Sequence, residues 1–172
     1  MLTKISHALG ACHRGAAHEG LCLTNDTITT PARPYTTFYH NKTSYDDDAN
    51  TANANNTAGI LNWPLSSNFG AVIDSSAMYF YYSGSNLVDM IFAPGNSSYQ
   101  MVLFEEGSND MYIDVRPLDT DRAYIPPIKV KNWYVCTTVY AYRYRSLVWN
   151  MVLMSEPQDP TCSKVEVQRV WV

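Results

Sequence analysis

Charged side chains are scarce in this chain: Asp, Glu, Lys and Arg make up 16% of its 172 residues, against about 25% in an average globular protein. The 16 acidic residues outnumber the 12 Lys and Arg residues, and the formal net charge is −4. Basic side chains form no stripe along the sequence. Because nucleic-acid binding depends on such a basic surface, these absences argue against a nucleic acid as partner.

Long apolar runs are also missing. No run reaches the ~18 residues of a membrane-spanning helix, so we expect no membrane span. The first ten residues include Lys4 and His7 and lack the apolar core, roughly 7–15 residues long, of a signal peptide. The two interpretations are a secreted chain from which the signal peptide has been removed and a cytosolic protein. The features described below favour the first.

Signatures of nucleophilic catalysis are absent. No Gly-x-Ser-x-Gly occurs, and no Ser or Cys lies in a known nucleophile motif. Glu105 and Glu106 would face opposite sides of a strand and cannot form an acid/base couple. We expect no cofactor, while a His–carboxylate pair assembled in three dimensions stays open. The histidines are His7, His13, His18 and His40.

What the chain does have is N-glycosylation sequons and cysteines in even number. A sequon is used only in the secretory pathway, and paired cysteines persist in oxidising compartments. Together they predict a secreted, or secretory-lumen, glycoprotein with disulfide bonds. The four sequon asparagines are Asn25, Asn41, Asn55 and Asn96, and the four cysteines are Cys12, Cys22, Cys136 and Cys162.

Four cysteines allow three pairings. We favour the local one, Cys12–Cys22 and Cys136–Cys162, because the second bridge would tie the last strand into the sheet. A zinc site built from Cys12, His13, His18 and Cys22 is the alternative, but its spacing fits no common zinc template. The acidic run 46–48 could attract Ca²⁺, yet three consecutive carboxylates point in different directions. We expect no metal.

Short runs rich in β-branched and aromatic residues, separated by turn residues, indicate an all-β fold. We find no helical period and no internal repeat, and we predict one domain over 1–172, an antiparallel β-sandwich or jelly-roll-like barrel. Residues 1–24 are expected to be a disulfide-closed loop region and 42–58 a mobile polar loop. The predicted strands are 36–40, 60–65, 78–82, 87–92, 99–105, 111–116, 132–140, 147–154 and 164–172.

Tyrosine, with 13 residues, is the most suggestive side chain for binding. Over residues 140–145 tyrosines alternate with an alanine and two arginines, so an extended strand would carry a tyrosine stripe on one face. Such a surface suits a sugar or a flat organic ligand, although ordinary core packing is a competing interpretation. The candidate ligand-binding residues are Tyr140, Tyr142, Tyr144, Trp63, Tyr79 and Tyr81.

Several stretches resemble a family of small secreted, disulfide-containing proteins of filamentous fungi, most of them without an assigned activity. The stretches are NWYVCTT at 132–138, LVW at 147–149, PQDPTC at 157–162, KVEV at 164–167, and the N-terminal ACH and EGLC at 11–13 and 19–22. The resemblance implies secretion, disulfides and a β fold. A weaker resemblance is to fungal hetero-Diels–Alderases of tropolonic sesquiterpene pathways.

Two functions follow as hypotheses. The first is a cofactor-free pericyclase, which holds two apolar partners in reacting geometry, an effect worth roughly 7–11 kcal/mol, beside donors for a polarised oxygen. The second is a non-catalytic lectin-like or effector-like binder. The partner is accordingly a small molecule or a glycan, and a homodimer stays open. The candidate catalytic residues are Tyr142, Arg143, Arg145 and Lys131.

Overall fold

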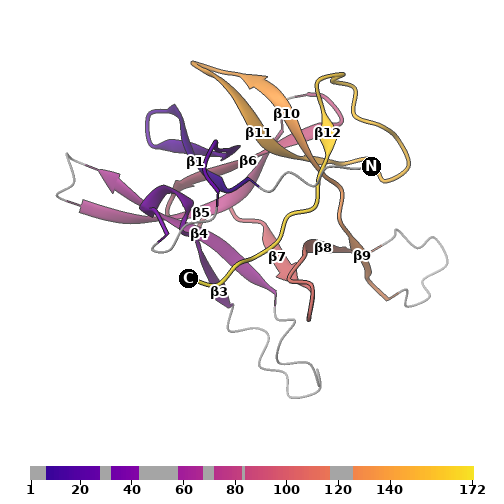
Figure 1. The fold of residues 1–172 in the computed structure, drawn as a ribbon, viewed down its shortest axis with the longest axis horizontal. Helices are drawn as coiled ribbons and strands as arrows, with labels where there is room; N and C mark the ends of the chain where they lie inside the picture. Colours follow the sequence, from indigo (N-terminus) through magenta and orange to yellow (C-terminus); the bar gives the residue numbers. More distant parts are fainter. Residues whose placement is uncertain (1–6, 28–31, 43–57, 68–71, 83, 117–125) are drawn as a thin grey trace.

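The computed structural model describes residues 7–27, 32–42, 58–67, 72–82, 84–116 and 126–172. These residues form twelve β-strands and one short 3-10 helix, with no α-helix among them (Figure 1). The prediction of an all-β antiparallel domain is confirmed. The elements are β1 (Leu9–Gly15), β2 (His18–Leu23), η1 (Pro34–Thr36), β3 (Tyr39–Lys42), β4 (Gly59–Ser67), β5 (Val72–Tyr82), β6 (Leu87–Pro94), β7 (Met101–Phe104), β8 (Met111–Val115), β9 (Ile128–Val130), β10 (Trp133–Val139), β11 (Arg143–Asn150) and β12 (Ser163–Lys164).

All the strands belong to one antiparallel sheet. Ten of them follow the order β12-β10-β11-β2-β6-β5-β4-β7-β8-β9, while β1 pairs with β2 and β3 pairs with β4. The sheet curls strongly, so that its two ends approach each other as in half of a barrel (Figure 1). The curl lets one sheet enclose its own core.

The N-terminal segment corrects one prediction. Residues 9–23, which we expected to be loop, form the β1–β2 hairpin, and β2 lies inside the sheet between β11 and β6. Leu21 and Cys22 are buried there. Gly20 is required for close packing, since a Cβ at this position would lie 2.5 Å from the Arg14 Nε atom and 3.1 Å from the Cys12 sulfur. Gly20, one of the small residues that suggested a turn, therefore allows the Arg14 and Cys12 side chains to pack closely against β2.

The core fills the inside of the curl. Trp133 and Trp149 pack edge to face at its centre, with ring centroids 4.6 Å apart. The Trp133 indole N–H donates to the Met111 carbonyl oxygen over 2.7 Å. Because Trp133 begins β10 and Met111 begins β8, this bond joins strands from opposite ends of the sheet.

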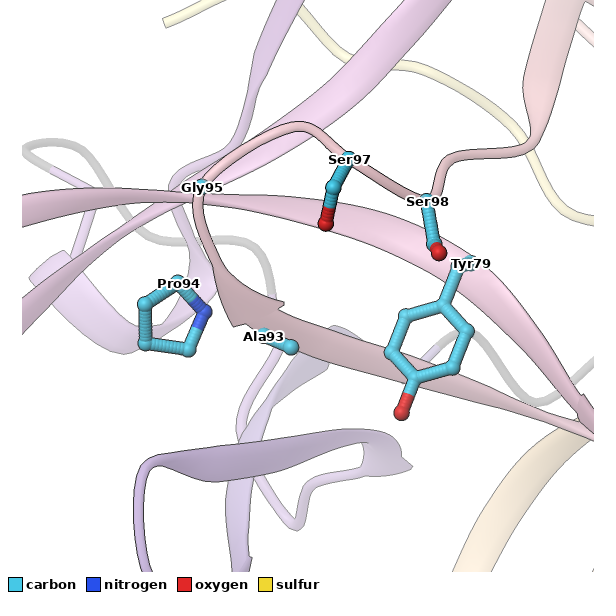
Figure 2. Close-up of a pocket in the computed structure, with 6 residues that line it drawn as sticks. All are labelled: Tyr79, Ala93, Pro94, Gly95, Ser97 and Ser98. Atoms are coloured by element: carbon cyan, nitrogen blue, oxygen red, sulfur yellow. The ribbon is translucent and has the colours of Figure 1, made fainter.

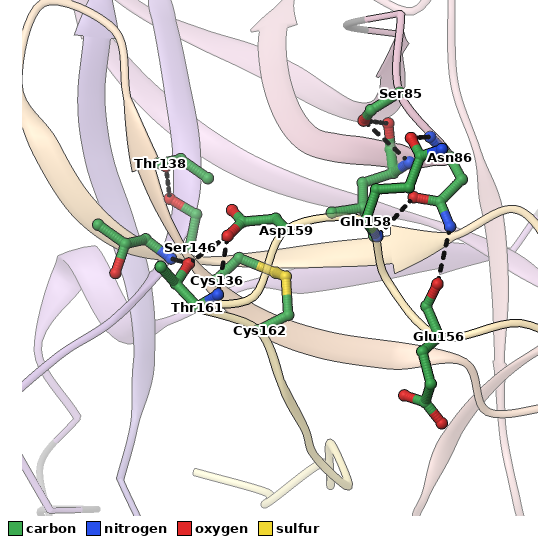
Figure 3. The surroundings of a disulfide bond; sticks show 12 residues. Ser85, Asn86, Cys136, Thr138, Ser146, Glu156, Gln158, Asp159, Thr161 and Cys162 are labelled. Carbon is green, nitrogen blue, oxygen red and sulfur yellow. Dashed lines mark hydrogen bonds between the residues drawn. A yellow bond between two sulfur atoms is a disulfide. The ribbon is translucent and has the colours of Figure 1, made fainter.

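Both predicted disulfides are present: Cys12–Cys22 crosses the β1–β2 hairpin, and Cys136–Cys162 fastens the segment before β12 to β10 (Figure 3). Figure 3 also shows the Asp159 carboxylate accepting from the backbone N–H and hydroxyl of Thr161, beside the bridge. The second bridge fixes the start of the C-terminal segment.

The C-terminal segment departs from the predicted strand 164–172. β12 is only two residues long, and the chain then crosses the open side of the curled sheet. The Val165 N–H donates to Trp133 of β10, and the Met111 N–H of β8 donates to Val167. Val165 and Val167 pack on the core. The segment thus acts as a strap between the two ends of the sheet.

Most of the expected polar loop 42–58 lies outside the described residues, as do Asn55 and the acidic run 46–48. None of the described helices is long and apolar enough to cross a membrane. The two disulfides are compatible with folding in the secretory pathway.

Candidate ligand-binding surfaces

The predicted tyrosine stripe over residues 140–145 is interrupted by a turn. Val139 pairs with Arg143 across the β10–β11 hairpin, and the Tyr140 N–H donates to the Tyr142 carbonyl oxygen over 3.1 Å. Residues 140–142 are therefore the hairpin loop rather than part of an extended strand. The expectation of an extended run is wrong here, and the three tyrosines do not form one flat face.

The turn nevertheless gathers tyrosines that are distant in sequence. The Tyr140 ring lies 6.2 Å from Tyr81 of β5, and the Tyr142 ring lies 6.2 Å from Tyr144 and 6.1 Å from His13. We call this group, Tyr81, Tyr140, Tyr142 and Tyr144, the hairpin cluster.

A buried ion pair lies beneath the hairpin cluster. The Arg14 Nη2 atom donates to the Ser146 hydroxyl over 2.6 Å and to Asp89 Oδ1 over 3.3 Å. The two charged side chains are 3% and 7% exposed. The Tyr140 hydroxyl donates to the other Asp89 oxygen over 2.9 Å, and the Arg14 guanidinium lies 4.5 Å from the Tyr140 ring centroid. Tyr140 is thus bound to the pair by its hydroxyl and its ring.

The electrostatics of this group follow from its burial. Burial raises the pKa of Tyr140, and the neighbouring Asp89 carboxylate raises it further. The Arg14 Nε and Nη1 atoms have no hydrogen-bond partner among the described residues. Arg14 links β1 to β6 and β11, so its role is to join strands. Nothing in the sequence separates Arg14 from a surface arginine, because its partners lie 75 and 132 residues away.

A second tyrosine-rich region lies along the edge of β5. After β6 the chain turns at Gly95, which has φ +86°, and residues 95–100 run back beside β5. The Ala77 N–H donates to the Gly95 carbonyl oxygen over 3.2 Å, and the Gln100 N–H donates to the Met78 carbonyl oxygen over 2.7 Å. These two bonds hold the segment 95–100 against β5 at both ends.

Between this segment and β5 lies a groove of about 520 Å³, which we call the tyrosine groove. A smaller hollow of about 190 Å³ adjoins it and shares Tyr79, Ser97 and Ser98 (Figure 2). No charged side chain is among the described residues that line either space. The tyrosine groove is lined by Tyr79, Phe80, Tyr82, Ser97, Ser98, Tyr99 and Gln100.

The groove is open to solvent. Tyr82 is 65% exposed and Tyr99 is 49% exposed, whereas Tyr79 is half-buried, and burial raises its pKa. Tyr79 was a predicted ligand-binding residue, whereas Tyr99 and Gln100, which also line the groove, were not. The turn residues after β6 predicted that the chain changes direction near residue 95. They did not show that residues 95–100 then bond to β5.

The remaining candidates lie elsewhere. The Lys131 ammonium group donates to Glu105 and to Asp110 over 2.6 Å each, so it is held in an ion-pair network. The Trp63 indole N–H donates to the Pro34 carbonyl oxygen over 3.2 Å, and its ring packs against the core. Arg143 and Arg145 are exposed on β11. None of these four side chains is among the described residues that line the tyrosine groove, while Arg143 and Arg145 flank Tyr144 of the hairpin cluster on β11.

The metal alternatives lack thiolates. Cys12 and Cys22 are joined in a disulfide, and so are the two cysteines that lie near Asp159, Cys136 and Cys162. A cysteine binds zinc only as a deprotonated thiol, and a disulfide sulfur is not one. The His–carboxylate pair left open by the sequence does form: His13 Nδ1 lies 3.1 Å from Glu19 Oε1.

Three described sequon asparagines, Asn25, Asn41 and Asn96, are exposed. Asn96 is distinct because the two residues after it, Ser97 and Ser98, line the tyrosine groove.

No curated protein and no solved structure matches the chain. One protein family, described as a domain of unknown function (DUF7907), matches residues 6–171, nearly the whole length. The chain belongs to this DUF7907 family.

Proposed function

We propose that this protein is a secreted, non-catalytic glycoprotein that binds a neutral carbohydrate in the tyrosine groove. The observation that carries the proposal is the lining of the groove, which combines Tyr79, Tyr82 and Tyr99 with the polar residues Ser97, Ser98 and Gln100. A sugar ring has an apolar face that packs on an aromatic ring and hydroxyls that bond to such polar groups at its rim.

The openness of the groove supports a sugar over an apolar small molecule. Pockets for apolar, drug-sized ligands bury about 70–90% or more of the ligand surface. Here Tyr82 and Tyr99 are largely exposed, so a ligand would keep one side in water, as a sugar can. The uncharged lining favours a neutral sugar over an acidic one.

The cofactor-free pericyclase remains the second proposal, and the geometry supports it less. Bringing two apolar substrates together requires a site that holds both in a fixed orientation and excludes water. The proposed donors Arg143 and Arg145 are exposed, and Lys131 is held by two carboxylates. The conversion of an isolated quinone methide and a terpene alkene to a single stereoisomer would favour this second function.

Binding of neutral oligosaccharides tests the first proposal. The protein should be made without glycans, in an oxidising bacterial compartment, so that the measured affinity for the oligosaccharide is not affected by the protein's own sugars. Tyr99→Ser and Tyr82→Ser should each weaken binding about tenfold, equivalent to about 1.4 kcal/mol. Tyr142→Ser removes an equally exposed tyrosine from the hairpin cluster and should have no effect. Absence of binding to chitin-, glucan- and mannan-type oligosaccharides, or an equal loss in Tyr142→Ser, would refute the proposal.

A further inference from the structure

The tyrosine groove has a glycosylation sequon at its rim. Asn96, Ser97 and Ser98 form the sequon, and all three are exposed. Ser97 and Ser98 line both the groove and the smaller hollow, and Figure 2 shows the two serines at the hollow. An N-linked glycan on Asn96 would therefore begin one residue away from the wall of the groove.

The backbone keeps Asn96 at that position. The Gly95 N–H donates to the Ser75 carbonyl oxygen over 2.9 Å, and the Gly95 carbonyl oxygen accepts from the Ala77 N–H. Four residues after Asn96, the Gln100 N–H is bonded to Met78. Asn96 thus sits in a short segment fastened to β5 at both ends. The bonds at Gly95 and Gln100 limit how far this segment can carry a glycan away from β5.

The chemistry of the groove suits the inner sugars of such a glycan. These sugars are neutral, and each has an apolar face that can pack on a tyrosine ring. The groove is lined by Tyr79, Tyr82 and Tyr99, and no charged side chain is among its described lining residues. Binding of a sugar there would therefore not require a charged group to be desolvated. A ligand tethered this closely has an effective concentration in the millimolar range.

We infer that Asn96 carries an N-linked glycan whose first sugars lie in the tyrosine groove, so that glycosylation at Asn96 blocks the site to an external sugar. The competition with an external sugar rests on the proposed function; the position of the glycan does not. A tethered sugar at a few millimolar weakens the apparent affinity for a free sugar with a Kd of ~0.1 mM by roughly tenfold or more.

The other described sequons provide internal controls. Asn25 follows β2, and Asn41 lies in β3. Both are exposed, and neither they nor their neighbours line the groove. Glycans at these two positions should be accessible to an enzyme that cleaves at the asparagine, whereas the glycan at Asn96 should be protected.

Site-by-site deglycosylation tests the position of the glycan. Protein secreted by a eukaryotic host would be treated with a glycan-releasing amidase, and release at each asparagine followed by peptide mass spectrometry. Each rate is divided by the rate in denatured protein. We expect release at Asn96 to be at least about fivefold slower than at Asn25 and Asn41. The Tyr82→Ser/Tyr99→Ser double variant should remove this protection, whereas Tyr142→Ser should preserve it. An unglycosylated Asn96, or equal normalised rates at the three asparagines, would overturn the inference.

A second measurement tests the competition. Chitotriose binding would be compared between the glycosylated protein and its Asn96→Gln variant from the same host, with Asn25→Gln as the matched control. We expect Asn96→Gln to bind roughly tenfold or more tightly and Asn25→Gln to behave like the parent. Equal affinity in the parent and Asn96→Gln would overturn the blocking role and leave the carbohydrate site standing. If no form binds chitotriose or the other neutral oligosaccharides, the proposed function fails, while the deglycosylation rates still decide where the Asn96 glycan lies.

Discussion

The hairpin cluster and the tyrosine groove both draw tyrosines from β5, but among their described residues only the cluster has a tyrosine hydroxyl bonded to the protein, that of Tyr140. In the cluster, the Tyr140 hydroxyl is bonded to Asp89 and its ring lies over Arg14. In the groove, the hydroxyls of Tyr79, Tyr82 and Tyr99 make no hydrogen bond to any described residue. Abundance of tyrosine therefore does not by itself identify a binding surface.

The bonding of the side chains separates structural tyrosines from tyrosines available to a ligand. A hydroxyl already bonded to a buried carboxylate must break that bond before it can bind a ligand, and the buried carboxylate then loses a hydrogen-bond donor. A hydroxyl that faces water exchanges one partner for another at little cost. On this reasoning Tyr140 closes over the ion pair that joins β1, β6 and β11, and the groove is the surface that we propose for the ligand.

The largest effect we expect is from Arg14→Met. It leaves Asp89 buried without its cation, which costs about 3–5 kcal/mol of unfolding free energy. Arg143→Met, at an exposed site on β11, should change stability by less than about 0.5 kcal/mol. Urea unfolding followed by tryptophan fluorescence measures both. If Arg14→Met is as stable as Arg143→Met, the ion pair does not hold the strands together.

Removal of the Cys136–Cys162 bridge should have the next largest effect on stability and none on the groove. Replacing both cysteines with alanine frees a 26-residue span, and loop-closure entropy predicts a loss of about 3 kcal/mol. Oligosaccharide affinity, measured at a temperature where the variant is folded, should be unchanged because the bridge lies at β10 and the groove at β5. Weakened sugar binding would mean that the two regions are coupled.

A paired hydroxyl deletion tests the comparison itself. Tyr140→Phe removes a hydrogen bond to a buried carboxylate and should cost about 1–2 kcal/mol. Tyr82→Phe, in the groove, should leave stability within about 0.5 kcal/mol. Thermal unfolding of the two variants provides the measurement. Equal losses in both would remove the distinction between structural and available tyrosines.

Much of the fold was predictable because short runs rich in β-branched and aromatic residues, bounded by turn residues, are typical of strands. The runs around β4 to β8, β10 and β11 were placed from this pattern. The same pattern did not show which strands the C-terminal segment bonds to. Val165 and Val167 do face the core, but their backbone bonds go to two different strands, so no continuous ladder forms.

The candidate site was less predictable, because its residues meet only through the chain reversals. The turn at 140–142 contains no Gly, Pro or Asn to mark it, and so the tyrosine stripe was expected to be extended. The groove depends on the segment 95–100 folding back along β5 rather than continuing away. The sequon at Asn96 was visible in the sequence, but the position of its Ser97 and Ser98 in the lining of the tyrosine groove was not.

The smallest effect we expect comes from the partly buried ion-pair network of Lys131, Glu105 and Asp110 beside the strap. The hydrogen bond from Lys131 holds the pKa of Asp110 below its usual range. A second hydrogen bond from Lys131 lowers the pKa of Glu105. Bonds to these carboxylates raise the pKa of Lys131. Because a carboxyl with a lowered folded-state pKa stabilises the fold only while ionised, this contribution is present near neutral pH. It is lost as the pH falls below about 4 and through the folded-state value.

Asp110→Asn should therefore reduce the loss of melting temperature between pH 6 and pH 3. Asp114→Asn is the matched control with the opposite sign: burial raises the pKa of Asp114, so its charge opposes folding near neutral pH, and its removal should steepen the acid-side loss. Both effects should be smaller than that of Arg14→Met, since solvent screens the network and leaves the Arg14 pair dry. If the acid dependence is the same in Asp110→Asn as in the parent, the network contributes nothing to stability. The buried ion pair beneath the hairpin cluster would then be the stronger electrostatic tie of the two.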